Sequence, residues 1–230
     1  MTFWEEDEDE KLATVSNEIV DLSFRIQCKI LPVDHGWELG QAIVKYLPWL
    51  PDEPDAALHQ ILVAESGNGW LSPEGGNAML YPSRRTRLAL RLPKQRVDET
   101  IAALDRQTLN LADRYEILLT NPELHQLSRL TTLYTRFAIF HEGESEEQFL
   151  ERTQHQLATR NIHPRKMVCG RINLLNKDGK EVVTKSLMLA ELTLKESIAL
   201  QQRGLDEGKD FGCGLFLPHK TVENLLSEDN

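Results

Sequence analysis

The sequence predicts an α+β fold made of two tandem ferredoxin-like (RRM-like) units, each with the element order β-α-β-β-α-β. Two observations lead to this prediction. Segments in which apolar and polar residues alternate are typical of half-buried strands, whereas apolar residues three or four positions apart are typical of helices. The two kinds of segment follow one another in the same order in both halves of the chain, although the residues themselves do not repeat.

The first half opens on "VDLSFRIQCKIL", in which Leu22, Phe24 and Ile26 share one face of a strand. The segment "WELGQAIVKYLPWL" then has helical spacing, and Asp34 is the residue expected to cap its N-terminus. The same two patterns predict the remaining elements of this half. The expected strands are residues 20–31, 59–66, 85–93 and 110–119, and the expected helices are 37–50 and 94–109.

The second half repeats this order. Ser145 and Gln148 match a capping box at the start of a helix, and the Asp-Gly pair in "NKDGK" predicts a hairpin turn between two strands. The expected strands are 131–140, 165–175, 182–192 and 213–219, and the expected helices are 145–161 and 195–205. The expected organisation is an acidic disordered leader (1–18), a first unit (19–122) and a second unit with a glycine-rich loop (128–222).

The composition bears on partners and compartment. The formal net charge of the 230 residues is −10 at pH 7, which argues against a nucleic-acid partner. Much of this charge lies within residues 1–21, which hold eight acids and one base. The remaining residues have a net charge of only −3, which weakens the objection to a nucleic-acid partner. Such an acidic run is typical of a solvated tail, and it could instead mimic a phosphate backbone and shield a basic face. The three widely spaced cysteines and the lack of a ~20-residue apolar run predict a cytoplasmic protein without a membrane partner.

One histidine lies at a place suited to proton transfer. His35, in "VDHGW", falls between the first expected strand and the first expected helix. Its ordinary pKa of ~6.5 lets a histidine give or take a proton near neutrality. The alternative is a loop histidine without a chemical role. No His or Cys spacing typical of a metal site occurs, and the glycines match no nucleotide fingerprint, so neither a metal nor a cofactor is expected.

Three segments have the composition of an anion-binding surface. Residues 83–96, "SRRTRLALRLPKQR", carry six bases and no acid, and arginine forks suit phosphate oxygens. Residues 160–171, "RNIHPRKMVCGR", are also basic and lead into the hairpin, as suits an RNA groove. Residues 204–220, "GLDEGKDFGCGLFLPHK", place four glycines before a strand, where backbone N–H groups can turn toward a phosphate. Each segment can equally be a solvated face or a flexible turn.

Several blocks along the chain resemble those of a known family. They are "VDLSFRIQCKILPVDHGWELGQAI", "ESGNGW", "LYPSRRTRLALRLP", "KMVCGR", "KSLMLAEL" and "GLDEGKDFGCGLFLPHK". Together they are similar to the CRISPR-associated repeat-RNA endoribonucleases of the Cas-six family, most closely its MYXAN subtype. The resemblance implies tandem ferredoxin-like folds and metal-independent cleavage of CRISPR precursor RNA within its repeats to give mature guide RNA. Attack by a 2′-hydroxyl would leave a 2′,3′-cyclic phosphate and a 5′-hydroxyl. The implied partners are hairpin repeat RNA and other Cas subunits.

The resemblance also implies roles for residues. His35 matches the family's catalytic histidine by its place between the first strand and the first helix. Relatives often carry a tyrosine or lysine one turn further on, where this chain has Glu38 and Leu39. The expected substitutes are Tyr81, Ser83 and Arg84. The expected RNA contacts are Arg84, Arg85, Arg87, Arg165, Lys166, Arg171, Gly204, Gly208, Lys209, Gly212, Gly214 and Lys220.

Two other functions fit the same sequence. The first is a repeat-RNA-binding subunit with little turnover, which stays on its product within a larger effector complex. The second is a protein-interaction module, which suits the acidic charge and which the fold alone does not exclude. Failure to bind any repeat hairpin at low salt would favour the second.

Overall fold

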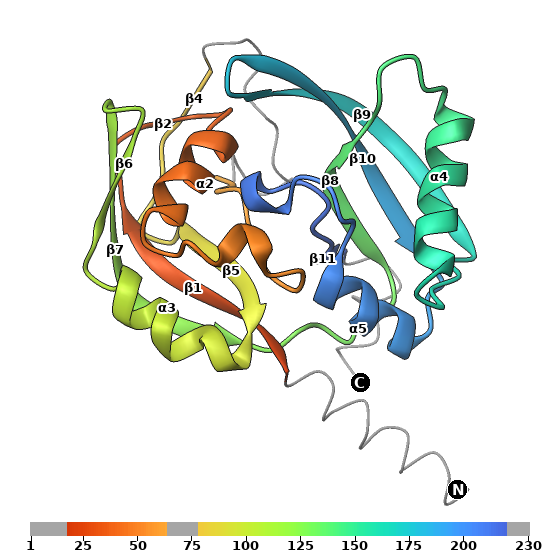
Figure 1. Ribbon diagram of the computed structural model, residues 1–230, viewed down its shortest axis with the longest axis horizontal. Coiled ribbons are helices and arrows are strands. Elements are labelled where there is room, and N and C mark those ends of the chain that lie inside the picture. The colour runs from red at the N-terminus through yellow and green to blue at the C-terminus, as the bar shows by residue number, and fades with distance from the viewer. Residues whose placement is uncertain (1–17, 64–77, 220–230) are drawn as a thin grey trace, which may run out of the picture.

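The computed structural model describes residues 18–63 and 78–219 of the chain. Two antiparallel sheets, one from each half, form the frame of the molecule, and a two-stranded ribbon accompanies the first. Figure 1 shows the first sheet at the left, with β1, β5 and β7, and the second at the right, with β8, β9 and β10. Each sheet has a hydrophobic core of its own, so each half of the chain buries its apolar residues largely by itself.

The first sheet has the strand order β3-β5-β1-β7-β6, and every pairing is antiparallel. Leu22 pairs with Leu90 and Phe24 with Leu88, and this apolar face belongs to the same core as Leu39 of α2 and Leu104 of α3. The elements are β1 (Ile19–Gln27), β2 (Leu31–Pro32), α2 (Gly36–Val44), η1 (Leu50–Asp52), β3 (Ala57–Leu58), β4 (Met79–Leu80), β5 (Arg87–Pro93), η2 (Lys94–Arg96), α3 (Val97–Leu104), β6 (Thr108–Leu111) and β7 (Tyr115–His125).

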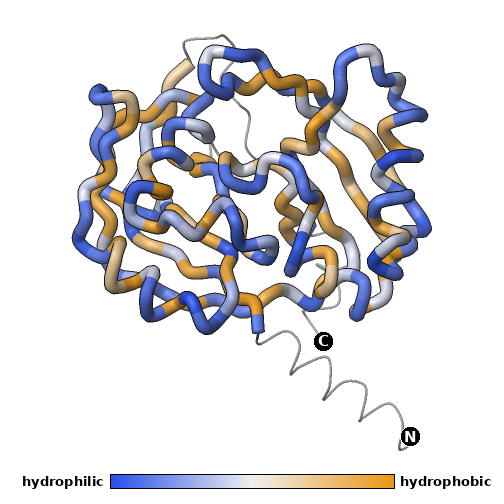
Figure 2. The backbone as a smooth tube through the Cα atoms, in the orientation of Figure 1, coloured by the Kyte–Doolittle hydropathy of each residue, from blue (hydrophilic) through white to orange (hydrophobic). Residues whose placement is uncertain are grey.

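The second sheet has the order β11-β8-β10-β9. Phe149 of α4 and Leu200 of α5 pack with Leu187 and Leu189 of β10 in its core. Figure 2 shows how hydrophobic and hydrophilic residues alternate along the strands of both sheets. The elements are β8 (Leu133–Ile139), α4 (Glu146–Ala158), β9 (Lys166–Lys177), β10 (Lys180–Ala190), α5 (Leu194–Arg203), η3 (Lys209–Phe211) and β11 (Leu217–Pro218).

The turn chemistry read from the sequence is confirmed in the second half. The Ser145 side chain accepts a hydrogen bond from the Gln148 backbone N–H, which completes the capping box of α4. Thr193 and Glu196 form a second such box at α5. Asp178 and Gly179 have φ of 52° and 76°, as a two-residue hairpin turn between β9 and β10 requires.

Four expected elements of the first half are wrong in extent. The expected helix 94–109 is a 3-10 turn (η2) followed by α3, which ends at Leu104, and Thr108 and Leu109 belong to β6. Residues 59–63 of the expected strand 59–66 are not in a strand, and the strand of this region is β3, just before them. Beyond His59 the chain leaves the sheet, and the Ile61 N–H turns to the ring of His35. Residues 64–66 lie outside the described part. The expected strand 110–119 is instead a hairpin of β6 and β7, because Ala112 and Asp113 adopt positive φ. The first helix ends at Val44, well before the expected residue 50 and before Pro48, which disfavours helical backbone in the residue preceding it.

Two smaller expectations also fail. His35, not Asp34, is the N-cap residue of α2, and no side chain caps this helix, because the Asp34 carboxylate accepts the Asn176 N–H instead. The last strand, β11, is limited to Leu217–Pro218, since the backbone before it belongs to the glycine-rich loop. The expected leader lies almost entirely outside the described residues, which begin at Glu18. No helix in the described ranges is long and apolar enough to cross a membrane.

Candidate functional site

His35 lies at the N-terminus of α2, and its side chain is buried, with 2% of the residue exposed. Its Nδ1 lies 2.8 Å from the Pro32 carbonyl oxygen and 3.1 Å from that of Val33. Its Nε2 accepts the Ile61 N–H at 3.0 Å. Because an acceptor is required at Nε2, the proton of the neutral ring sits on Nδ1. Burial lowers the pKa of His35 to about 4, although the two carbonyls oppose this shift.

The glycine-rich loop, Gly204–Gly214, packs directly on the helix that follows His35. A Cβ atom on Gly36 would lie 2.5 Å from the Phe211 carbonyl oxygen, and one on Gly40 would lie 2.3 Å from that of Asp210. Only glycine therefore permits this approach of loop and helix. The Gln60 side-chain amide also donates to the Phe211 carbonyl at 3.2 Å. We call His35, Ile61, Gln60 and the loop segment around Phe211 the His35 junction.

Several backbone N–H groups of the glycine-rich loop bond within the protein. The Leu205 N–H donates to Gly214, the Cys213 N–H to Gly208 and the Gly214 N–H to Phe137, at 2.7–2.8 Å. The glycines at 204, 208, 212 and 214 all have positive φ, which shapes the loop. The expected phosphate cradle would need N–H groups free to point outward. In this conformation these three amides are engaged.

Lys209 is turned inward as well. Its Nζ donates to the carbonyl of Pro54 and, at 3.3 Å, to that of Arg203. Burial lowers the pKa of this amine, with part of the shift offset by Asp206. Lys209 thus ties the loop to the first half of the chain. Lys220, expected to join it at a phosphate, lies outside the described residues.

Two of the three acids of the loop, Asp206 and Glu207, pair with bases of the second half. Asp206 contacts Arg160 and Arg203 at 3.7 and 3.4 Å. Glu207 contacts His141 at 3.0 Å and Arg152 at 3.9 Å. These carboxylates are therefore compensated locally.

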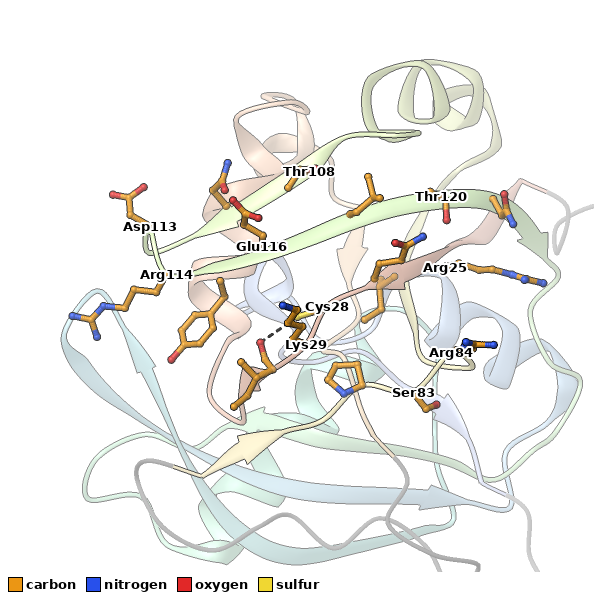
Figure 3. A pocket seen from close by; sticks show the side chains of 18 residues that line it. Arg25, Cys28, Lys29, Ser83, Arg84, Thr108, Asp113, Arg114, Glu116 and Thr120 are labelled. Atoms are coloured by element: carbon orange, nitrogen blue, oxygen red, sulfur yellow. Dashed lines mark hydrogen bonds between the residues drawn. The ribbon is translucent and has the colours of Figure 1, made fainter.

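A hollow on the first half is lined by four basic side chains, Arg25, Lys29, Arg84 and Arg114, and by two acidic ones, Asp113 and Glu116 (Figure 3). We call it the basic hollow. Arg25 and Arg84 lie at one end of it and Arg114 at the other, with Lys29 between them. Its lining comes from the end of β1, the segment after β4 and the hairpin of β6 and β7, namely residues 25–30, 82–84, 108, 110, 113–116, 118, 120 and 121. Ser83 and Arg84, named as sites from the sequence, are brought to its wall.

The charges beside the hollow are poorly compensated. Arg25 of β1 pairs in register with Arg87 of β5, and like charges opposite one another on two strands are destabilising. Arg87 donates to the carbonyls of Arg84 and Thr86 at 3.2 and 3.4 Å. Among the described residues, no ion pair involves Arg25, Arg84 or Arg87. A bound anion would relieve this repulsion.

The structure does not bring the four expected catalytic residues together. Tyr81 is 70% exposed and follows Leu80, which pairs with Leu31 of β2. Ser83 forms a turn with Thr86, whose hydroxyl accepts the Ser83 N–H at 2.9 Å. His35 is buried, and its Nδ1 lies against the carbonyl of Pro32, which pairs with Met79 in this ribbon. The exposed residues line or flank the basic hollow, whereas His35 belongs to the interior.

The expected RNA contacts of the second half have different surroundings. Arg165 and Arg171 are exposed, and Arg171 lies where two residues of β9 face one residue of β10. Lys166 pairs with Glu191. Within the described ranges, no group of three or more His, Cys, Asp or Glu side chains is placed to hold a metal ion.

Sequence reasoning missed three bases of the hollow, Arg25, Lys29 and Arg114. Arg25 carried a signal, because the alternation of β1 places it on the polar face together with Asp21. Its register with Arg87 follows only from the strand pairing. Arg114 reaches the site through the hairpin that the sequence did not reveal.

Similarity to known proteins extends over nearly the whole chain. Residues 20–221 match the family model described as "Cas6 Crispr". The CRISPR-associated endonuclease Cas6 of Myxococcus xanthus (strain DK1622) is 29% identical over 199 residues, which are 86% of this chain and 81% of that protein.

Solved structures are similar in fold. A structure described as "Characterization of a Cas6-related gene from Pyrococcus furiosus" has a TM-score of 0.62 at 9% identity and covers 88% of this chain and 99% of its own. One described as "An RAMP protein binding different RNA substrates" has a TM-score of 0.62 at 12% identity, with 87% and 100% covered.

Proposed function

Since this chain belongs to the Cas6 family, as its sequence blocks suggested, we propose that it is an endoribonuclease that cleaves CRISPR repeat RNA. The observation that carries the proposal is the match to an endonuclease of this family over 86% of the chain. The uncompensated arginines at the basic hollow support it, because a duplex or single strand of RNA offers a row of phosphates to such a surface.

The proposed reaction is transfer within the RNA backbone and needs no metal. The 2′-oxygen forms a bond to the adjacent phosphorus while its proton passes to a base, and the bond from phosphorus to the 5′-oxygen breaks. The 5′-oxygen takes up a proton, so the products are a 2′,3′-cyclic phosphate and a 5′-hydroxyl. Such a step requires a proton acceptor, a proton donor and positive charge at the crowded phosphate.

We propose His35 as the group that transfers a proton, on condition that its ring is released. In the described conformation Nε2 is occupied by the Ile61 N–H and Nδ1 by carbonyls. RNA binding would have to draw the segment at Ile61 away. The neutral ring with a vacated Nε2 would then be a base, and return of its pKa toward 6.5 would follow from hydration. Tyr81, Ser83 and Arg84 remain the proposed partner groups at the phosphate.

The proposed RNA path runs over the basic hollow and over exposed bases at the start of β9 and just before it. Arg84, Arg85 and Arg87 supply the first part, and Arg25, Lys29 and Arg114 extend it. Arg165, Lys166 and Arg171 supply the second. The glycine-rich loop, with Lys209, supports this surface from behind, because the amides of Leu205, Cys213 and Gly214 and the amine of Lys209 bond to the protein.

The strand orders support two ferredoxin-like units. The order β7-β1-β5-β3 in the first sheet and β11-β8-β10-β9 in the second are both the fourth-first-third-second arrangement of a β-α-β-β-α-β unit. In the first sheet β6 is an addition at the edge. We propose units spanning 19–122 and 128–222, cytoplasmic placement, and assembly with other Cas subunits.

Repeat RNA with a single 2′-deoxy nucleotide before the scissile bond tests the mechanism. The RNA is the repeat of the CRISPR array nearest the coding sequence. Wild-type protein in EDTA should cleave the all-ribose RNA to a cyclic phosphate, and should bind the 2′-deoxy RNA equally well without cleaving it. Cleavage of the 2′-deoxy RNA, or a strict requirement for a divalent ion, contradicts the mechanism.

A low-turnover subunit is the second candidate, and one observation favours it. Val168, Ile172 and Leu174 on the edge strand β9 are 50–58% exposed, a degree of apolar exposure that suits contact with another protein. If the protein is such a subunit and RNA is in excess, the amount of cleaved RNA should stop rising at one molecule per protein molecule. Many turnovers per protein would instead support a recycling enzyme.

A further inference from the structure

Arg91 carries a charge into the interior between the two halves. It belongs to β5 of the first sheet and is only 1% exposed. Its Nε and Nη2 donate to the two oxygens of Asp21, each at 2.9 Å. Its Nη1 donates to the carbonyls of Gln201 at 2.7 Å and Phe216 at 3.0 Å. The last two acceptors belong to the second half of the chain.

These two carbonyls lie on the two stems of the glycine-rich loop. Gln201 is in the last turn of α5, shortly before Gly204, and Phe216 comes shortly after Gly214. The stems are also joined to each other, since the Leu205 N–H donates to the Gly214 carbonyl at 2.8 Å. One guanidinium from the first sheet therefore holds both ends of the loop at once.

The loop passes this constraint on to the His35 junction. Its Phe211 carbonyl accepts from Gln60 and lies against Gly36. Gln60 is adjacent to Ile61, whose N–H binds the ring of His35. A continuous series of contacts thus runs from Arg91 through the loop to His35.

We propose that Arg91 is a positioning residue that fixes the glycine-rich loop against the first sheet, with Asp21 holding the guanidinium in the orientation this requires. A buried guanidinium must have its donors satisfied. Because two of the partners are loop stems, movement of the loop leaves a buried charge short of acceptors. Asp21 also contacts His59 at 3.1 Å. Although burial alone raises the pKa of Asp21, His59 and Arg91 hold it below its ordinary value.

Hydrogen exchange of the full-length protein tests this without reference to RNA. A double variant, Asp21→Leu with Arg91→Met, removes both charges, so neither is left buried alone. The loop amides of Leu205, Cys213 and Gly214 should exchange about tenfold faster or more, whereas amides of the β1–β5 pairs should keep their protection. Arg91→Lys, whose point charge cannot reach both stems and Asp21 together, should give an intermediate increase.

Arg96→Met is the matched control, because Arg96 contacts Glu53 and Glu99 within the first half and touches no loop stem. It should leave the loop amides unchanged. A folded double variant whose loop amides exchange as in wild type overturns the proposal. If the double variant does not fold, the exchange of the same loop amides is measured in Arg91→Lys. Exchange rates equal to those of the wild type in that variant also overturn the proposal.

The consequence for catalysis rests on the proposed function. In single-turnover cleavage of repeat RNA, the double variant should be slower by about tenfold to a hundredfold, because displacement of supporting structure by an ångström has effects of this size. If wild-type protein cleaves no repeat RNA, the proposed function fails while the exchange result still decides the role of Arg91. If the loop amides are released but cleavage is unchanged, the link from the loop to His35 is wrong.

Discussion

The His35 junction and the basic hollow satisfy their polar groups in opposite ways. At the junction, both ring nitrogens of His35 have backbone partners, and the ring is kept neutral by burial. At the hollow, Arg25 and Arg87 stand opposite each other, and neither forms an ion pair within the described part of the chain. A site already satisfied by the protein contributes to stability, whereas an uncompensated charge cluster is arranged for a ligand. Substitutions at the His35 junction should therefore change the free energy of unfolding as well as cleavage, whereas substitutions at the basic hollow should change the affinity for RNA.

His35→Ala should have the largest effect. Cleavage should fall by about 10²–10⁴ if the ring transfers a proton, while RNA binding stays nearly intact. The free energy of unfolding should also fall by about 2–3 kcal/mol, because the Ile61 N–H and the Pro32 carbonyl lose their partner. Single-turnover cleavage and urea unfolding measure the two effects on the same preparation.

Leu39→Ala is the matched control for that experiment. Leu39 is fully buried one turn along the same helix, so its truncation should lower the free energy of unfolding by about 2–5 kcal/mol without removing the ring. Cleavage per folded molecule should stay near wild type. If Leu39→Ala loses as much activity per folded molecule as His35→Ala, the role of His35 is structural and the chemistry lies elsewhere.

The pH dependence of stability should show the next largest effect. The His35 pKa is about 4 in the folded protein against an ordinary value of 6.5, so between these values the unfolded chain binds more protons. The stabilisation is complete above pH 6.5 and is lost as pH falls toward 4, by roughly 3 kcal/mol. His35→Asn, which keeps a donor near Nδ1 and has no atom at Nε2, should unfold with a flatter profile in this window.

Asp21 supplies an internal check on that profile. Its pKa is held below the ordinary value near 3.8, so its contribution is present above that value and is lost only at lower pH. The difference between wild type and His35→Asn should therefore level off near pH 4, while both proteins go on losing stability in stronger acid. Equal slopes for the two proteins between pH 6.5 and 4 would show that His35 is not buried in solution.

Local patterns predicted the framework because they report on neighbours in the chain. The alternation of Leu22, Phe24 and Ile26 identifies the buried face of β1, and Ser145 with Gln148 identifies the start of α4. The position of His35 between a strand and a helix was read from the same patterns. Its burial was not, because the Ile61 N–H that occupies its ring comes from a segment 26 residues away.

The charged residues show the same limit more clearly. By alternation, Arg91 shares a strand face with Arg87, and nothing local separates them. Arg87 lies beside the hollow, whereas Arg91 is covered by α5 and the chain after the loop, 110 and 125 residues away. Lys209, a predicted phosphate contact, reaches the Pro54 carbonyl, 155 residues distant, in the described conformation. Charge composition identifies candidates, but tertiary contacts decide which of them face solvent.

Arg25→Ala should have the smallest effect on the fold and a specific one on binding. Arg25 is exposed and its removal relieves repulsion with Arg87, so the free energy of unfolding should change by less than about 0.5 kcal/mol. Affinity for repeat RNA at low salt should fall about tenfold, and the slope of log K against log salt should decrease by about one. Lys45→Ala, an exposed base of the first half outside the hollow, is the matched control. Equal losses for both variants would mean that general charge, not the basic hollow, holds the RNA, and the contrast between hollow and junction would then disappear.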